Sequence, residues 1–223
     1  MSSPTALDGV QLGLRADVRL PARAPAPRAA GPHRRAAAFA SLSSSLSGGL
    51  GRRGPAYDLA DAAQAQVNLR VVRVPGDGRC MFRALAIGLA DIKGMTFTSR
   101  QEEREADELR LAVADAICRT PGKRAGYPEA VSAIKLEGDL EGYCKRVLYP
   151  TFWGGEPELL VLSQMLRQPI KVYMRQPAEG RDGTKFVELV TYGEQYAVSR
   201  KTGVPRKPVH LLFNGKDHYD LLL

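Results

Sequence analysis

The 223-residue chain has few of the residues that mark disulfide-rich, zinc-binding or membrane-spanning proteins. Its three cysteines, Cys80, Cys118 and Cys144, form no Cys-x-x-Cys pair. An odd count without an apolar signal segment is typical of free thiols in a reducing compartment. None of the three histidines lies at ligand spacing from a cysteine pair, so we expect no metal and no cofactor. No uninterrupted apolar run approaches the length of about 18 residues that a membrane span needs, which predicts a soluble protein.

Lysine is missing from the first 57 residues, which contain eight arginines and two aspartates. This segment holds +6 of the formal net charge of +8, which leaves only +2 for the remaining 166 residues. Its Ala-, Arg-, Ser-, Pro- and Gly-rich composition cannot bury enough apolar surface to offset the entropy of ordering. We therefore predict a disordered tail over residues 1–57 and a folded domain over residues 58–223. The balanced charge of the domain indicates an ordinary solvated surface, so we expect no nucleic acid to bind there.

The composition of the tail allows two interpretations. Arg- and Ser-rich segments that are poor in acids resemble the transit peptides of organelles. A flexible basic tail without any targeting role fits the same composition. Asp8 and Asp17 weaken the transit-peptide interpretation.

Periodicity and turn signals predict one early strand, a block of helices and a closing set of strands in the domain. The early strand covers residues 67–74 and stops at a Pro-Gly-Asp-Gly turn. Helices are expected from Cys80 onward, over about 100–119, over about 136–148 and after Gly154-Gly155. The closing strands are expected over residues 170–174, 186–192, 209–213 and 219–222. This order predicts a compact α/β domain that borders on α+β.

The segment Gly76-Asp77-Gly78-Arg79-Cys80 places a cysteine at the start of a helix, directly after a tight turn. The positive end of the helix dipole should lower the pKa of such a thiol and favour the nucleophilic thiolate. Free N–H groups of the turn could stabilise an oxyanion, and glycine lets a substrate backbone come close. A dinucleotide fingerprint does not fit, because Met81 stands where a third glycine is needed. The alternative is a buried packing cysteine, and the turn favours the nucleophile.

A cysteine nucleophile needs a base, and His218 is the best candidate among the histidines. His33 lies in the tail, and His210 lies in an apolar strand, where a packing role is expected. His218 lies in a polar loop just before a strand. Asp220 follows two residues later, and residues i and i+2 of a strand point to the same side. Asp220 could therefore accept the imidazole N–H and orient the ring.

Four segments together resemble the ovarian tumour (OTU) family of deubiquitinating cysteine proteases, and its plant-type members in particular. They are residues 76–83, residues 153–159, residues 170–173 and His218-Tyr219-Asp220, in the family's order and spacing. The resemblance covers roughly residues 68–222. It implies a papain-like α/β fold, with a small central sheet flanked by helices. It also implies that Cys80 attacks, that His218 is general base and then general acid, and that Asp220 orients it.

The resemblance extends to residues around this triad. Family members also carry an aspartate at the position of Asp77, which is sometimes counted in the active site. From the residues alone, Asp77 is a helix N-cap that could bind the Cys80 amide, so we expect a supporting role. The counterpart of Trp153 borders the cleft, although a core aromatic is an equal alternative. We predict that substrate-binding residues are Trp153, Gly154, Gly155, Gly78 and Arg79.

The resemblance implies a deubiquitinase that hydrolyses isopeptide bonds at the C-terminal glycine of ubiquitin in a thiol-dependent reaction. We expect a monomer whose partners are ubiquitin and ubiquitinated proteins, and no membrane association. One alternative is a catalytically silent ubiquitin-binding module of the same fold, and another is a nucleic-acid adaptor that uses the basic tail. Because ubiquitin conjugates occur in the cytosol and nucleus, we expect a cytoplasmic or nuclear location. A plastid or mitochondrion is the alternative if the tail is a transit peptide.

Overall fold

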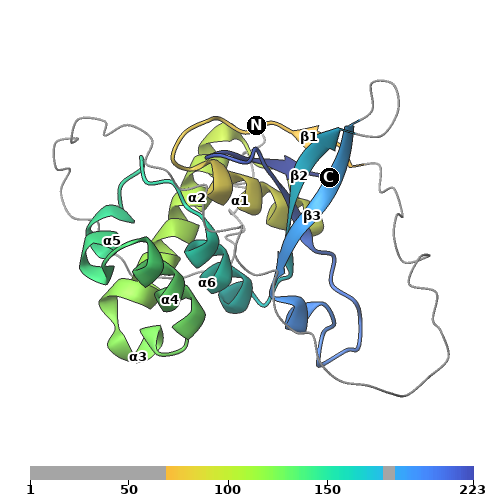
Figure 1. The fold of residues 1–223 in the computed structure, drawn as a ribbon. Helices are drawn as coiled ribbons and strands as arrows, with labels where there is room; N and C mark the ends of the chain where they lie inside the picture. Colours follow the sequence, from red (N-terminus) through yellow and green to blue (C-terminus); the bar gives the residue numbers. More distant parts are fainter. Residues whose placement is uncertain (1–68, 178–183) are drawn as a thin grey trace, which may run out of the picture.

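The computed structural model describes residues 69–177 and 184–223, which form a five-stranded sheet packed against helices (Figure 1). The strand order is β1-β5-β4-β2-β3, and only β2 and β4 run parallel. The strands are β1 (Val71–Val72), β2 (Ile170–Pro177), β3 (Thr184–Tyr192), β4 (Val209–Phe213) and β5 (Tyr219–Leu222). The expectations for residues 1–57, and for the first part of the domain up to residue 68, lie outside the described residues.

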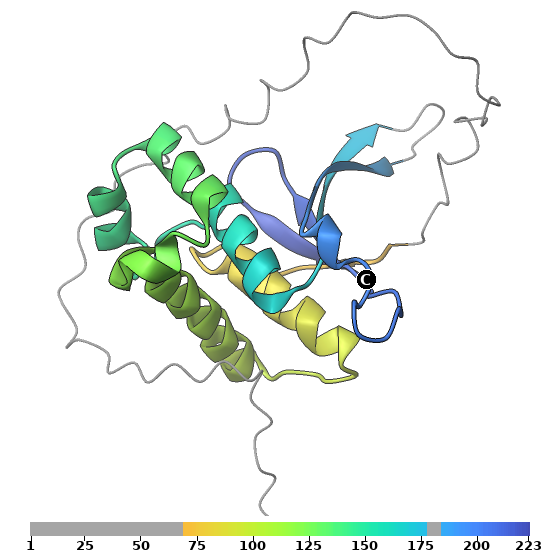
Figure 2. The same cartoon turned by 90° about the horizontal axis from the view of Figure 1, so that it is seen from below.

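The helices gather beside this sheet, and Figures 1 and 2 show α1, α2 and α6 lying side by side. Helix α1 packs against β4, β5 and α2, and its apolar face forms much of the core. The helices are α1 (Cys80–Ile92), α2 (Ser99–Ala114), α3 (Pro121–Arg124), α4 (Pro128–Glu137), α5 (Leu140–Arg146) and α6 (Glu156–Leu166). A π-helical turn (Asp115–Arg119) extends α2, and a 3₁₀ turn (Glu194–Tyr196) follows β3. The prediction of an α/β domain with a small sheet flanked by helices is confirmed.

Local sequence explains where the two longest helices begin and which faces they bury. Helix α2 starts with a capping box, in which the Thr98 N–H donates to Gln101 Oε1 at 2.8 Å. Leu109, Val113 and Ile117 follow at helical spacing and are fully buried. None of the helices in the described part of the chain is long and apolar enough to cross a bilayer.

Two predicted elements differ from the structure for local reasons. The single helix predicted over residues 136–148 is wrong, because the chain breaks at Gly138 and restarts as α5. Asp139 caps the new helix by accepting a hydrogen bond from the Gly142 amide at 2.6 Å. Within the described residues the early strand is also shorter than predicted, because β1 covers only Val71 and Val72 at the edge of the sheet. Backbone hydrogen bonds between Arg70 and Leu223 extend its pairing with β5 by one residue.

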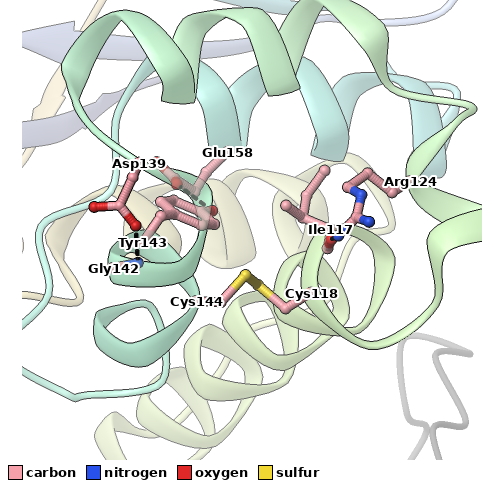
Figure 3. Close-up of a disulfide and its surroundings, with 8 residues drawn as sticks. All are labelled: Ile117, Cys118, Arg124, Asp139, Gly142, Tyr143, Cys144 and Glu158. Carbon is pink, nitrogen blue, oxygen red and sulfur yellow. Dashed lines mark hydrogen bonds between the residues drawn. A yellow bond between two sulfur atoms is a disulfide. The ribbon is translucent and has the colours of Figure 1, made fainter.

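The expectation that all three cysteines are free thiols is wrong. Cys118, in the π-helical turn, and Cys144, in α5, form a disulfide with a Cα–Cα distance of 5.6 Å (Figure 3). The two residues are 26 positions apart and belong to different helices, so their proximity arises only from the packing of those helices. Cys80 is free and buried.

Candidate active site

A hydrogen-bonded turn places Cys80 at the start of α1. The Asp77 carbonyl accepts from the Cys80 amide at 3.1 Å, and the Asp77 amide donates to the Pro75 carbonyl at 2.9 Å. The Asp77 carboxylate accepts from the Arg79 amide at 2.9 Å and from Arg83 Nη2 at 3.2 Å. Asp77 is therefore not the N-cap that binds the Cys80 amide through its side chain. Arg79 holds the N-cap position, and Asp77 supports the turn from within.

The same hydrogen bonds contradict the prediction that N–H groups of this turn are free to bind an oxyanion. The amides of Asp77, Arg79 and Cys80 all donate to acceptors inside the turn. A developing oxyanion would have to compete with these acceptors or use other donors of the site. The sequence signal of a glycine-containing turn does not distinguish engaged amides from free ones.

Gly78 is needed for the approach of another protein segment. A Cβ atom on this glycine would lie 2.4 Å from the Pro150 carbonyl oxygen and 2.6 Å from the Thr151 carbonyl carbon. Backbone atoms cannot yield as a flexible side chain can. The space beside Gly78, where a substrate backbone was expected, is therefore occupied by the loop at residues 150–151.

His218 and Asp220 form the predicted pair. Asp220 is 3% exposed on β5, and its Oδ1 lies 3.0 Å from His218 Nε2. The same carboxylate accepts from the Val74 amide at 3.1 Å and from Arg73 Nη1 at 2.9 Å. An ionised carboxylate can only accept hydrogen bonds, so the neutral ring should carry its proton on Nε2. His218 Nδ1 then has its lone pair free, and this buried atom has no hydrogen-bond partner among the described residues.

The thiol of Cys80 lies beside the loop that carries His218. Its Sγ is 4.0 Å from the Asp217 carbonyl oxygen, 137 positions along the chain. His218 Nδ1 faces the turn before Cys80, 4.0 Å from where a Cβ on Gly76 would lie. The structure thus gathers Cys80, His218 and Asp220 at one place, as the sequence analysis predicted.

The expected lowering of the Cys80 pKa is wrong for this structure. Burial raises the pKa of the thiol to about 11, from an ordinary value of 9.0. Hydrogen bonds from the backbone at Tyr219 and Met81 lower the pKa, and the charges of Asp77 and Asp217 raise it again. Desolvation outweighs the helix dipole because the side chain is only 2% exposed. In this state Cys80 is a neutral thiol at physiological pH.

The residues predicted to contact substrate fall into two groups. Trp153 is partly buried against the core, and Gly154 lies over α1, where a Cβ would come within 2.6 Å of Met81 Cε. A Cβ on Gly155 would meet no described atom within 4 Å apart from its chain neighbours. Arg79 instead forms two hydrogen bonds with Asp107 of α2, at 2.8 and 3.0 Å. Contact of these residues with substrate stays a prediction, and the geometry favours it least for Arg79 and Gly78.

Two arginines that were not predicted from the sequence also support the site. Arg73 Nη1 forms an ion pair with Asp220 Oδ2 at 2.9 Å. Arg110 is 2% exposed in α2 and donates to the Gly78 carbonyl at 2.8 Å. A charged residue directly after Leu109 on the buried face of a helix is a signal that could have identified Arg110.

A buried thiol beside an imidazole that is oriented by a carboxylate can perform nucleophilic catalysis on a carbonyl group. Comparison with known proteins agrees with this chemistry. The model of the family described as OTU-like cysteine protease matches residues 75–202, which include the Cys80 turn.

Two similar curated proteins come from Arabidopsis thaliana. Ovarian tumor domain-containing deubiquitinating enzyme 3 is 44% identical over 165 residues, which cover 72% of this chain and 70% of that protein. Ovarian tumor domain-containing deubiquitinating enzyme 4 is 34% identical over 154 residues, which cover 69% of this chain and 43% of that protein. Among solved structures, the OTUD1 OTU domain is 21% identical with a TM-score of 0.46, covering 70% of this chain and 86% of that one. The chain belongs to the OTU-like cysteine protease family.

Proposed function

We propose that the chain is a deubiquitinase that hydrolyses the isopeptide bond between the C-terminal glycine of ubiquitin and a lysine amine. The observation that carries the proposal is the free thiol of Cys80 beside a His218–Asp220 pair, in a domain that matches the family. The similar Arabidopsis proteins are named deubiquitinating enzymes, which supports ubiquitin as the modifier. The partners are ubiquitin and ubiquitinated proteins, and the chain acts as a monomer.

The reaction starts from the neutral thiol of Cys80, with His218 as the base beside it. Cys80 Sγ attacks the glycine carbonyl carbon while His218 Nδ1 takes the thiol proton. The tetrahedral intermediate collapses, the bond to the lysine nitrogen breaks, and His218 gives its proton to the leaving amine. Water then attacks the thioester, with His218 accepting a proton from the water and returning it to the Cys80 sulfur. Asp220 keeps Nε2–H as a donor and stabilises the imidazolium formed in each half-reaction.

A panel of diubiquitins of every linkage, incubated with the full chain, tests this proposal. Wild type should release monoubiquitin, and Cys80→Ala should bind ubiquitin without cleaving it. His210→Ala is a matched control for His218→Ala, because His210 lies on β4 and its Nδ1 contacts the Tyr173 hydroxyl at 3.2 Å. Near-normal cleavage by Cys80→Ala would contradict the nucleophile.

A ubiquitin probe with a thiol-reactive C-terminus separates the enzyme from a silent binding module. Wild type should form a covalent adduct through Cys80, and Cys80→Ala should form none. Binding of ubiquitin without any adduct or cleavage by wild type would favour the silent module. Failure to bind ubiquitin at all would refute both.

We also propose that the protein acts in the cytosol or nucleus, where conjugated ubiquitin occurs. A fluorescent protein fused to the C-terminus leaves the N-terminal segment accessible to the import machinery of organelles. Diffuse cytosolic or nuclear fluorescence is expected. Import into a plastid or mitochondrion with removal of the N-terminal segment would contradict this location.

A further inference from the structure

Arg110 is a buried cation that contacts four backbone carbonyl groups in the described part of the chain. Its side chain is 2% exposed and is the largest by volume among the fully buried side chains there. Nη2 donates to the carbonyl of Gly78 at 2.8 Å. Nη1 lies within hydrogen-bond distance of three carbonyls of one loop, those of Phe152 at 2.9 Å, Tyr149 at 3.0 Å and Val147 at 3.4 Å.

These four carbonyls belong to two segments that meet at the candidate active site. Gly78 lies in the turn that ends at Cys80. The loop at residues 147–152 leads directly into Trp153, Gly154 and Gly155, the residues predicted to contact substrate. A Cβ on Gly78 would already clash with the backbone of this loop, so the two segments cannot come much closer, and the hydrogen bonds of Arg110 to both oppose their separation. One guanidinium therefore sets the distance between the nucleophile's turn and the neighbouring segment.

Neighbouring side chains orient the guanidinium itself. Its Cζ lies 4.7 Å from the ring centroid of Phe82, which is two residues after Cys80 on α1. Asp107 Oδ1 lies 3.9 Å from Arg110 Nε, and the same carboxylate pairs with Arg79. The turn is thus connected to α2 at two points, through the Gly78 carbonyl and through the Arg79 side chain.

Only arginine suits this position. Its planar fork presents five N–H donors in fixed directions, whereas the ammonium of lysine is a single charged point. Burial lowers the pKa of Arg110 to about 10, so the group stays charged at neutral pH. A buried charge costs free energy unless other groups solvate it, and here the four carbonyls do so together with the Asp107 carboxylate at 3.9 Å.

We propose that Arg110 is a positioning residue for the Cys80 nucleophile, which holds the catalytic turn against the loop at residues 147–152. It touches neither thiol nor substrate and acts through the Gly78 carbonyl. The proposal rests on the proposed function for its effect on turnover, because a displacement of the nucleophile by about 1 Å can slow an enzyme on the order of 100-fold. Its effect on the exposure of Cys80 does not depend on the identity of the substrate.

The test compares Arg110→Lys and Arg110→Met with Arg124→Lys and Arg124→Met in the full chain. Arg124 is a matched control, because its Nη1 donates to one backbone carbonyl, that of Ile117, at 3.1 Å (Figure 3). For Arg110→Lys, kcat on diubiquitin should fall about 30- to 100-fold, with KM changed less than about threefold. The Arg124 variants should keep kcat within about threefold of wild type.

A second measurement, which needs no ubiquitin, is the rate at which iodoacetamide alkylates Cys80. Release of the turn should expose the thiol, so Arg110→Lys should be alkylated about tenfold faster at pH 8, at a temperature where melting curves show it folded. Wild-type kcat in Arg110→Lys, or equal losses in the Arg124 variants, would overturn the proposal, as would unchanged alkylation. If wild type cleaves no diubiquitin, the proposed function fails while the alkylation comparison still decides the role of Arg110.

Asp107→Asn covers the case in which neither Arg110 variant folds. This change removes the carboxylate shared by Arg79 and Arg110 at a partly exposed position and leaves the guanidinium in place. We expect kcat to fall several-fold, with KM and the melting temperature nearly unchanged. An unaltered kcat in a folded Asp107→Asn would then refute the positioning role.

Discussion

Burial of Cys80 leads to a quantitative prediction of how its reactivity depends on pH. The structure raises the pKa of this thiol from 9.0 to about 11. At pH 8, a thiol of pKa 9.0 is about one-tenth ionised and a thiol of pKa 11 about one-thousandth. The folded enzyme should therefore carry about 100-fold less thiolate than the unfolded chain at that pH.

Alkylation by iodoacetamide, followed by mass spectrometry at Cys80, measures this difference. The rate in the folded protein should rise about tenfold per pH unit between pH 8 and 10 and show no plateau below pH 10. The slope is the informative quantity, because hindered access lowers the rate equally at every pH. In urea the curve should level off near pH 9 or above, as for an ordinary thiol. Cys118 and Cys144 are disulfide-bonded, so without reductant they do not compete for the reagent.

A plateau below pH 8 in the folded protein would refute the reasoning. It would mean that a thiolate–imidazolium pair with His218 exists before substrate binds, and that proton transfer precedes attack. The predicted curve instead leaves His218 as the base that takes the proton when substrate is bound. His218→Ala should not shift the curve of the resting enzyme to lower pH.

The same pKa shift predicts how stability changes in alkali. The folded-state pKa lies above the unfolded-state value, so the contribution of the neutral thiol is fully present below about pH 9. It is lost as pH rises through about 11, and a shift of two pKa units corresponds to about 3 kcal/mol. Urea unfolding at pH 8 and near pH 11 should show a larger loss for wild type than for Cys80→Ala. Equal losses would contradict the raised pKa.

Three further predictions concern the disulfide, the Gly78 turn and the triad. Replacing Cys118 and Cys144 by serine should lower the free energy of unfolding by about 3–4 kcal/mol, because the cross-link spans 26 residues and restricts the unfolded chain. Urea denaturation with and without reductant checks this, and a reductant effect that persists in the double serine variant would refute it. Gly78→Ala should cost about 1–3 kcal/mol and lower kcat, since its Cβ would meet the Pro150 carbonyl at 2.4 Å. Gly122→Ala, whose Cβ would meet none of the described atoms within 4 Å outside its own helix, should do neither in melting and turnover assays. His218→Ala should lower kcat by about 10²–10⁴-fold, and Asp220→Ala by less, because an orienting group does not itself transfer the proton. Steady-state kinetics on diubiquitin measures both, and negligible effects of both changes would remove the proposed dyad.

Local sequence was sufficient to predict the helices and strands that are defined by a turn, a cap or an apolar pattern of a few neighbouring residues. Strands β4 and β5 have the bounds that were predicted, 209–213 and 219–222, because apolar runs on either side of a polar loop define a hairpin. Helix α1 begins at Cys80, as the Gly-containing turn and the apolar periodicity predicted. The break between α4 and α5 was missed, although Gly138 and the capping residue Asp139 are local signals of it.

The sequence by itself also identified the side chains that the structure brings together at the site, because the chain has few histidines and cysteines. With one histidine in a polar loop before a strand and an aspartate two residues later, the His218–Asp220 pair follows from strand geometry alone. Only the tertiary structure decided the environment of these groups. Three features depend on contacts between segments that are far apart in the chain. They are the raised pKa of Cys80, the Cys118–Cys144 disulfide and the four carbonyls around Arg110. Burial and long-range proximity arise when helices and strands pack, and no pattern within one segment encodes them.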